Sequence, residues 1–257
     1  MSRASNDTPL FPWDICQEII EAFWWSSISN HDRVEFMLSS SLVSKTWRKL
    51  YTIVSFRDMH IPTPNYGLNM MHLGSLYNFI HDPAMNDMPA QMCRTITFHI
   101  QSSNLLENFP EENDECEMGR CATVTLYTLS NFANLLPNLR RVRFEYVNYP
   151  LTDVFHNLRL YFIPPQVDAI DLRYRFDSMV KPEIVSELRQ EEDMRHYATW
   201  ALANVKELTL IGGSRAVTRE ILRRTTNLRK LTVDEHGRVW DIPKGLLDTS
   251  KCRVVRI

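Results

Sequence analysis

The phrase NLRRVRF, Asn138–Phe144, decides the fold of this chain because two further copies of its pattern follow it. The copies are NVKELTL from Asn204 and NLRKLTV from Asn227. Each copy has an asparagine, an aliphatic residue, a cation, any residue, an aliphatic residue, any residue and an apolar residue. Such repetition is typical of proteins in which each repeat adds one small unit to a shared core.

Looser copies keep the apolar spacing without the asparagine, and they begin at Phe56, Cys93, Val167 and Cys252. The apolar spacing alone matches by chance at about one site in twelve in a chain of this composition. The order of the copies along the chain is therefore better evidence than any single copy. Apolar residues at helical spacing separate several copies and predict helices at Ala122–Leu136, Leu151–Phe162, Pro182–Leu202 and Ala216–Arg224. Alternating strands and helices predict an α/β fold.

The spacing of the last copies narrows the architecture. Leu228 follows Val205 by 23 residues and precedes Cys252 by 24, within the range of about 20–29 residues for leucine-rich repeats. The region 57–257 therefore resembles an irregular leucine-rich-repeat solenoid. The resemblance implies short parallel strands in one sheet, helices outside it, and a surface that recognises another protein.

Apolar residues at helical spacing also run through the start of the chain. They predict a helix in residues 11–25 and a second helix through Asp32–Ser39, capped by Asn30 or His31. A third, basic helix in SSSLVSKTWRKLY carries Trp47. Three short helices cannot bury all their apolar faces alone, so another surface must cover them.

This N-terminal segment is similar to an F-box. The phrases that carry the resemblance are FPWDICQEII, 11–20, and SLVSKTW, 41–47. Their order and the insert between them look most like fungal F-box proteins. The expected division of the chain is a disordered tail at 1–9, an F-box-like bundle at 10–56 and the repeat domain at 57–257.

The F-box resemblance implies a function. The helical stripes would dock on a Skp-family adaptor, and the chain would recruit a substrate to an SCF-type cullin–RING ubiquitin ligase without catalysing a reaction itself. The adaptor-binding residues carried over by position are Pro12, Ile15, Ile19, Ile20, Leu42, Val43 and Trp47. The alternatives are that these residues only pack against the chain's own core, and that the repeats form a binding scaffold with no role in ubiquitin transfer.

Strand alternation in the repeated phrases predicts a row of polar residues on one open face of the sheet. The row comprises Asp58, His60, Thr95, Thr97, His99, Arg141, Arg143, Glu145, Asp171, Arg173, Glu207, Thr209, Lys230, Thr232, Asp234 and Arg256. Within it, the cations Arg141, Arg143, Arg173 and Lys230 are candidates for binding an acidic group of the substrate. The alternative, favoured by the even alternation of charges, is a ladder in which Glu145, Asp171 and Glu207 neutralise the arginines.

Composition argues against several other classes of protein. The net charge is −2, which does not suit a dedicated nucleic-acid-binding protein. No run of about 18 apolar residues could span a membrane, and the first residues do not form a secretory signal. The five cysteines, Cys16, Cys93, Cys116, Cys121 and Cys252, are scattered, as expected of a reduced compartment, cytoplasmic or nuclear.

Candidate sites for metal or catalysis are weak. The acidic stretch 105–120 predicts a solvated loop, and Cys116 with Cys121 lacks the further ligands that zinc needs. The phrase IGGSRAV, Ile211–Val217, could hold an anion at a helix start, but a plain turn is the simpler interpretation. No catalytic motif occurs, so we expect no metal, no cofactor and no enzymatic activity.

Overall fold

The structure is a computed structural model that describes residues 12–67, 91–101, 117–177, 182, 185, 201–234 and 250–257. Its helices are α1 (Trp13–Trp24), α2 (Asn30–Ser40), α3 (Lys45–Arg57), α6 (Glu117–Asn131), α8 (Arg215–Arg224) and the 3₁₀ helices η2 (Ala133–Leu135) and η3 (Leu151–Phe162). Its strands are β1 (Asp58–Ile61), β2 (Thr95–Gln101), β3 (Arg141–Val147), β4 (Ala169–Arg175), β5 (Glu207–Ile211), β6 (Lys230–Val233) and β7 (Arg253–Arg256).

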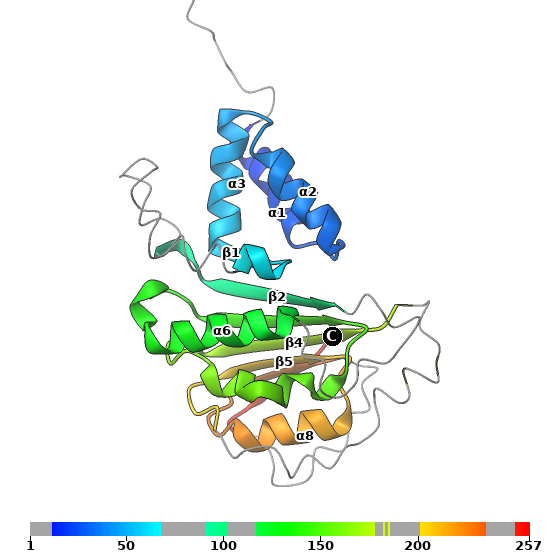
Figure 1. Cartoon of the computed structure of the whole chain (residues 1–257). Coiled ribbons are helices and arrows are strands. Elements are labelled where there is room, and N and C mark those ends of the chain that lie inside the picture. Colours follow the sequence, from blue (N-terminus) through cyan, green and yellow to red (C-terminus); the bar gives the residue numbers. More distant parts are fainter. Residues whose placement is uncertain are drawn as a thin grey trace, which may run out of the picture.

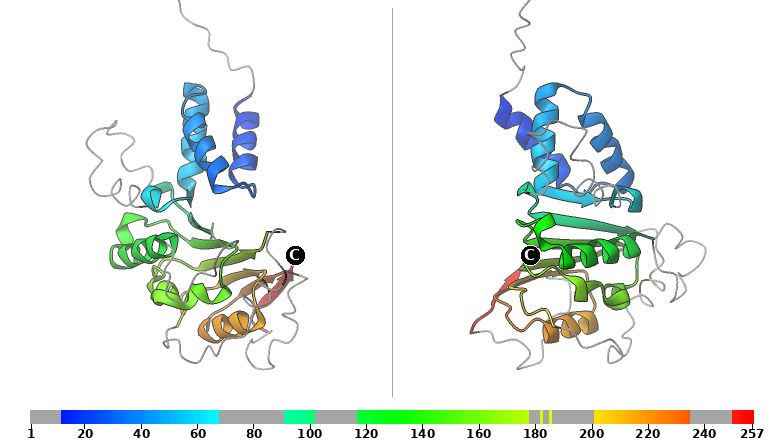
Figure 2. Two further views of the ribbon diagram at one scale, coloured as in Figure 1. Left: turned by 45° about the vertical axis from the view of Figure 1, so that its right-hand side comes forward. Right: turned by 60° about the vertical axis from the view of Figure 1, so that its left-hand side comes forward.

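The strands of the described residues form one seven-stranded sheet in the order β1 to β7, and every neighbouring pair is parallel. The helices α6, η3 and α8 lie against one face of this sheet, while α1, α2 and α3 form a bundle beyond its β1 edge (Figures 1 and 2). The predicted α/β class with short parallel strands is confirmed, and a strand occurs at each of the repeated phrases, including the looser copies.

The apolar residues of the phrases build the main core. In β3, Val142, Phe144 and Tyr146 are buried, whereas the residues between them are only half-buried. Parallel register stacks equivalent rings, and the Phe144 ring lies 5.6 Å from that of Phe98, its partner on β2. Strands β1 to β6 therefore contribute matching apolar side chains to a continuous layer beneath the helices.

A buried ion pair joins the core to η3. Arg159 has no exposed side-chain surface and pairs with Asp153. The same guanidinium donates hydrogen bonds to the hydroxyl of Tyr146 at 3.2 Å and, through Nε, to that of Thr123 at 3.3 Å. This network links η3, β3 and α6 across the helical layer.

Several helix boundaries differ from the predictions. α6 begins at Glu117, so residues 117–120 of the predicted acidic loop are helical, because Met118 and Cys121 are buried; residues 105–116 lie outside the described part. Leu151–Phe162 is helical as predicted but of the 3₁₀ type, and α8 matches its prediction. The helix predicted at Pro182–Leu202 lies almost entirely outside the described residues, as does the tail at 1–9.

The N-terminal helices also differ in their details. Ser29, rather than Asn30 or His31, caps α2 by accepting a hydrogen bond from the amide of Asp32. Residues 41–44 connect α2 to α3, so Leu42 and Val43 precede the third helix instead of lying on it. None of the described helices is long and apolar enough to cross a membrane.

Candidate protein-interaction surfaces

The N-terminal bundle has its own apolar core, separate from that of the sheet. Ile20, Trp24, Leu50 and Val54 are buried together, and Trp47 packs against them. Ile20 and Trp47, two of the seven residues expected to dock on an adaptor, therefore stabilise the bundle itself.

The other five predicted adaptor-binding residues lie on the surface. Leu42 is 83% exposed, Ile19 48% and Ile15 39%, and Val43 and Pro12 are exposed as well. We call Pro12, Ile15, Ile19, Leu42 and Val43 the bundle patch. The start of α1 and the turn between α2 and α3 both lie at the end of the bundle that is remote from the sheet (Figure 1).

Further large apolar side chains are exposed on the bundle, and among them Trp13 and Leu38 were missed by sequence reasoning. Phe23 and Trp25 lie at the end of α1, Trp13 at its start, and Leu38 on α2. The helical spacing of their neighbours could have located them, but only the packing shows which side of each helix stays uncovered. So many large apolar side chains exposed on three short helices favour an interaction site on the bundle.

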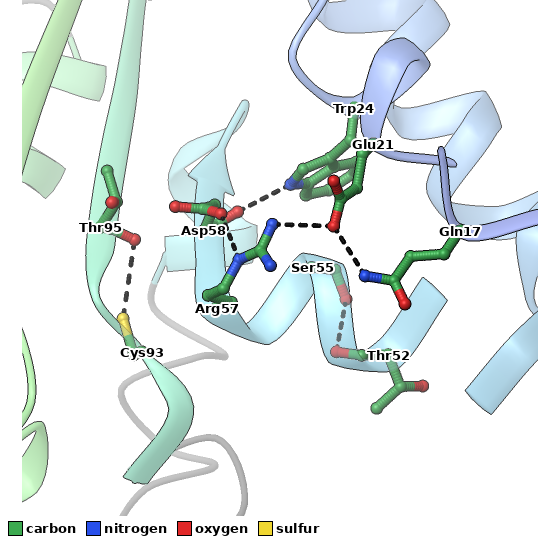
Figure 3. A network of polar contacts seen from close by, with 9 residues as sticks. All are labelled: Gln17, Glu21, Trp24, Thr52, Ser55, Arg57, Asp58, Cys93 and Thr95. Atoms are coloured by element: carbon green, nitrogen blue, oxygen red, sulfur yellow. Dashed lines mark hydrogen bonds and ion pairs between the residues drawn. The ribbon is translucent and has the colours of Figure 1, made fainter. Parts of the chain in front are cut away.

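Polar contacts fix the bundle to the sheet at its other end. The indole Nε1–H of Trp24 donates to the carbonyl oxygen of Asp58 at 2.7 Å. Arg57 donates to the carboxylates of Glu21 at 3.1 Å and Asp58 at 2.9 Å (Figure 3). Gln17, on the preceding turn of α1, donates from Nε2 to the carboxylate of Glu21 at 2.9 Å. The bundle patch thus has a defined position relative to the sheet.

The predicted open face of the sheet is covered at its β1 end. His60, Thr97 and His99 are buried, which corrects the expectation that they line an open surface. Trp24 covers His60, with its ring edge-on to the imidazole at 4.9 Å between ring centroids. Arg33, itself buried, donates to the Trp24 carbonyl oxygen and so holds the end of α1 in place.

Beneath this cover lies a buried histidine pair, His60 and His99. Nδ1 of His60 lies 2.7 Å from Nε2 of His99, whose Nδ1 lies 3.1 Å from Glu145. Burial lowers the pKa of both histidines, and the charges of Arg33 and Arg143 lower it further. Burial raises the pKa of Glu145, but the hydrogen bond from His99 and the nearby cations outweigh it and bring the pKa to about 2.

Two of the four predicted substrate-binding cations are committed to the sheet. Arg141 donates to Asp171 at 2.6 Å and to Glu207 at 2.8 Å, and Arg143 donates to Asp171 at 3.1 Å. Asp171 is 2% exposed and so serves both guanidinium groups from within the structure. For Arg141 and Arg143 the alternative of a self-neutralised ladder describes the geometry.

The other two predicted cations have no such partners within the described part of the chain. Arg173 is half-buried, its Nε has no hydrogen-bond partner, and no ion pair joins it to another described residue. Burial lowers the pKa of Arg173, and the charge of Arg143 lowers it further. Lys230 is exposed on β6, level with Glu207 and Arg253 on the neighbouring strands.

The register of β7 corrects one member of the predicted row. Arg256 pairs with Val233, a buried residue of β6, whereas Arg253 pairs with Lys230. The sequence prediction placed β7 one residue later than the structure does. A shift of one residue exchanges the two faces of a strand, so Arg253 rather than Arg256 aligns with the open-face row.

The glycine-containing turn before α8 is a structural turn in this protein. Gly212 has φ of 71°, and its amide donates to Asp234 at 3.0 Å, while Ser214 caps α8. An aspartate therefore occupies the amide that an anion would need. In the described residues no group of three or more metal-ligating side chains occurs, and Cys121 is free and buried while Cys116 lies outside them.

Comparison with protein-family models, curated proteins and solved structures gives no match for this chain. The arguments for function therefore rest on its own residues.

Proposed function

We propose that this chain is the non-catalytic, substrate-recruiting subunit of an SCF-type cullin–RING ubiquitin ligase. In this proposal, residues 10–56 are an F-box that docks on a Skp-family adaptor. Residues 57–257 are a leucine-rich-repeat-like domain that holds a protein substrate. The protein would work inside the cell, in the cytoplasm or nucleus, and other subunits would carry out ubiquitin transfer.

The observation that carries the proposal is the bundle patch. Its five residues hold the positions that the F-box resemblance assigns to adaptor binding. All five are exposed, although the four other than Pro12 are large and apolar. An internal packing role would bury them, as it buries Ile20. Exposure at these positions supports docking on a partner.

The asparagines of the repeated phrase support a repeat domain. Asn138 donates from Nδ2 to the carbonyl oxygen of Gln91 at 2.7 Å, and Asn227 donates to that of Ala203 at 2.7 Å. Both bonds reach back by one repeat along the chain and satisfy a backbone group of the preceding turn. Side-chain bonds between successive repeats are a regular means of stacking them.

The test is complex formation between the full chain and a Skp-family adaptor. We expect co-expression to raise the soluble yield and size-exclusion chromatography with light scattering to show a 1:1 complex. A monodisperse chain that stays unbound at micromolar adaptor would contradict the proposal.

The second candidate is a protein-binding scaffold with no role in ubiquitin transfer. It is favoured by the place of Trp47 and Ile20 in the bundle core, because part of the apparent docking stripe serves internal packing. A scaffold would capture its partner through the sheet domain with the bundle patch mutated and with no adaptor present.

A further inference from the structure

A groove with a volume of about 1390 Å³ lies at the end of the sheet where the strands begin. It is bounded by the turns that precede β5 and β6, by the last turn of α8, and by the starts of β3 and β4. Its charged lining residues are Arg140, Lys206, Arg223, Arg229, Lys251 and Asp168. Five cations and one carboxylate thus face a single hollow in a chain whose overall charge is −2.

Three of these cations occupy the cation position of the repeated phrase. Arg140, Lys206 and Arg229 each precede the first residue of a strand. Backbone hydrogen bonds join neighbours in the row: the amide of Arg229 donates to Lys206 at 2.7 Å, and that of Lys206 donates to Asp168 at 2.7 Å. The amide of Asp168 donates to Arg140 at 3.0 Å. Adjacent members are therefore one strand spacing apart, about 4.8 Å.

The repeated cation forms no close ion pair with another described residue. Arg140 donates to the backbone carbonyl oxygens of Pro137 and Leu139 in its own turn, and to no carboxylate within the described part of the chain. Arg229 has no ion pair within the described part of the chain. Lys206 and Asp168 are 3.9 Å apart and both largely solvated, a contact that contributes little to stability. The phrase's asparagine bonds to the preceding repeat at Asn138 and Asn227, whereas its cation forms only local or solvated contacts.

Polar side chains complete the lining of the groove. Asn204 and Thr226 lie in the lining together with the cations. An acidic peptide carries negative groups for the cations and backbone N–H and C=O groups for these polar side chains, so its chemistry suits the groove.

We propose that this groove binds an acidic segment of another polypeptide, lying across the starts of β3 to β6 with its negative groups on Arg140, Lys206 and Arg229. The negative groups are carboxylates or phosphates, which the same cations accept. Whether the bound segment belongs to a substrate for ubiquitin transfer rests on the proposed function; the binding itself does not.

The probe is a fluorescein-labelled peptide of alternating glutamate and serine, titrated with the full chain by fluorescence anisotropy. A phosphoserine peptide with glutamine in place of glutamate distinguishes phosphate from carboxylate as the source of charge, and an all-neutral glutamine–serine peptide is the blank. We expect binding of an acidic probe that weakens as salt rises, because the cations are partly solvated. Equal binding of the neutral peptide would overturn the proposal.

Charge reversal locates the site. The double variant Lys206→Glu with Arg229→Glu is expected to weaken binding at least tenfold. The matched control is Arg175→Glu with Arg253→Glu, which changes the net charge equally at exposed positions outside the groove; we expect less than a twofold change. If both variants lose the same affinity for the peptide, net charge alone explains the effect and the assignment of the groove as the binding site is wrong.

A second variant, expected to bind the acidic peptide more tightly, tests the site even if the charge-reversal variant folds poorly. Asp168→Asn removes the single carboxylate of the lining and should strengthen binding about two- to threefold; unchanged or weaker binding contradicts the proposal. A short single-stranded RNA is the competing class of ligand, and if it binds the groove more tightly than either peptide, the peptide assignment is wrong. All groove variants should still bind the Skp-family adaptor, so failure here is distinguishable from failure of the proposed function.

Discussion

The bundle patch gives a prediction whose size follows from exposure. Fully burying an aliphatic side chain of this kind contributes about 1.5–3 kcal/mol. Leu42 is 83% exposed and Ile19 48% exposed in the free protein, so a covering partner would gain about 1.2–2.5 and about 0.7–1.4 kcal/mol from them. The double variant Ile19→Ser with Leu42→Ser should therefore lose about 2–4 kcal/mol of binding free energy, or about 30- to 700-fold in Kd.

The assay is isothermal titration of the purified full chain with a Skp-family adaptor, together with urea unfolding of the same samples. Leu42 is largely exposed and Ile19 half-exposed, so on the same scale the free energy of unfolding should fall by only about 1–2 kcal/mol, and the variant should remain folded. Trp47 is unsuitable for this test, since it packs against the buried core of the bundle.

The matched control removes two exposed apolar side chains from the helical layer of the sheet domain. Val124 is 46% exposed and Phe132 58% exposed, so Val124→Ser with Phe132→Ser deletes comparable surface far from the bundle. Adaptor binding should be unchanged in this control. If the patch variant binds as tightly as the unmodified chain, or the control loses as much affinity, the assignment of the bundle patch is wrong.

Three further predictions concern stability. Folding lowers the pKa of His60 and of His99 below the value of about 6.5 that each histidine has in the unfolded chain. Below about pH 6.5 the unfolded chain therefore binds more protons, and the free energy of unfolding should fall by up to about 1.4 kcal/mol per pH unit for each histidine as the pH drops. Equal urea midpoints at about pH 7.5 and 5.5 would contradict this. Asp153→Ala leaves the charge of Arg159 buried and should cost about 3–5 kcal/mol in urea unfolding, and a loss below about 1 kcal/mol would refute the importance of the pair. Gly212→Ala should cost about 2 kcal/mol or more because its positive φ and the carbonyl oxygen of Tyr174 leave no room for a Cβ. A Cβ at Gly213 would meet Thr218 and Tyr174 only at ordinary van der Waals distances, so Gly213→Ala should cost less than about 1 kcal/mol in the same measurement.

The strands could be predicted from the sequence because one short apolar phrase specifies both a strand and its inward face. Register was less certain where the phrase was incomplete. The copy at Cys252 lacks the asparagine, and counting from this cysteine placed Arg256 on the open face, although hydrogen bonding pairs it with Val233. Cys252 is buried beside the core all the same, so its apolar character gave no sign of the shift.

The cover over the first strands could not be predicted from local sequence. His60 and His99 have the alternation expected of open-face residues, yet both are buried, and Trp24 packs edge-on against His60. That contact depends on how α1 meets β1, which the hydrogen bond from Trp24 to Asp58 fixes. Likewise, helical spacing identified a stripe on the bundle, but packing decided that Ile20 is inside and Ile19 outside.

The two sets of cations in the repeats differ in what register places beside them, and this difference bears on where recognition can occur. On the open face, Arg143 lies directly opposite Asp171, so the charges neutralise each other inside the sheet. One residue before each strand, Lys206 and Arg229 are neighbours with no acid between them. A field that reaches a partner needs charges that are not already compensated. The cations at the strand starts meet that condition better than Arg141 and Arg143. We therefore expect electrostatic capture of a partner at the end of the sheet where the strands begin, rather than at the centre of its open face.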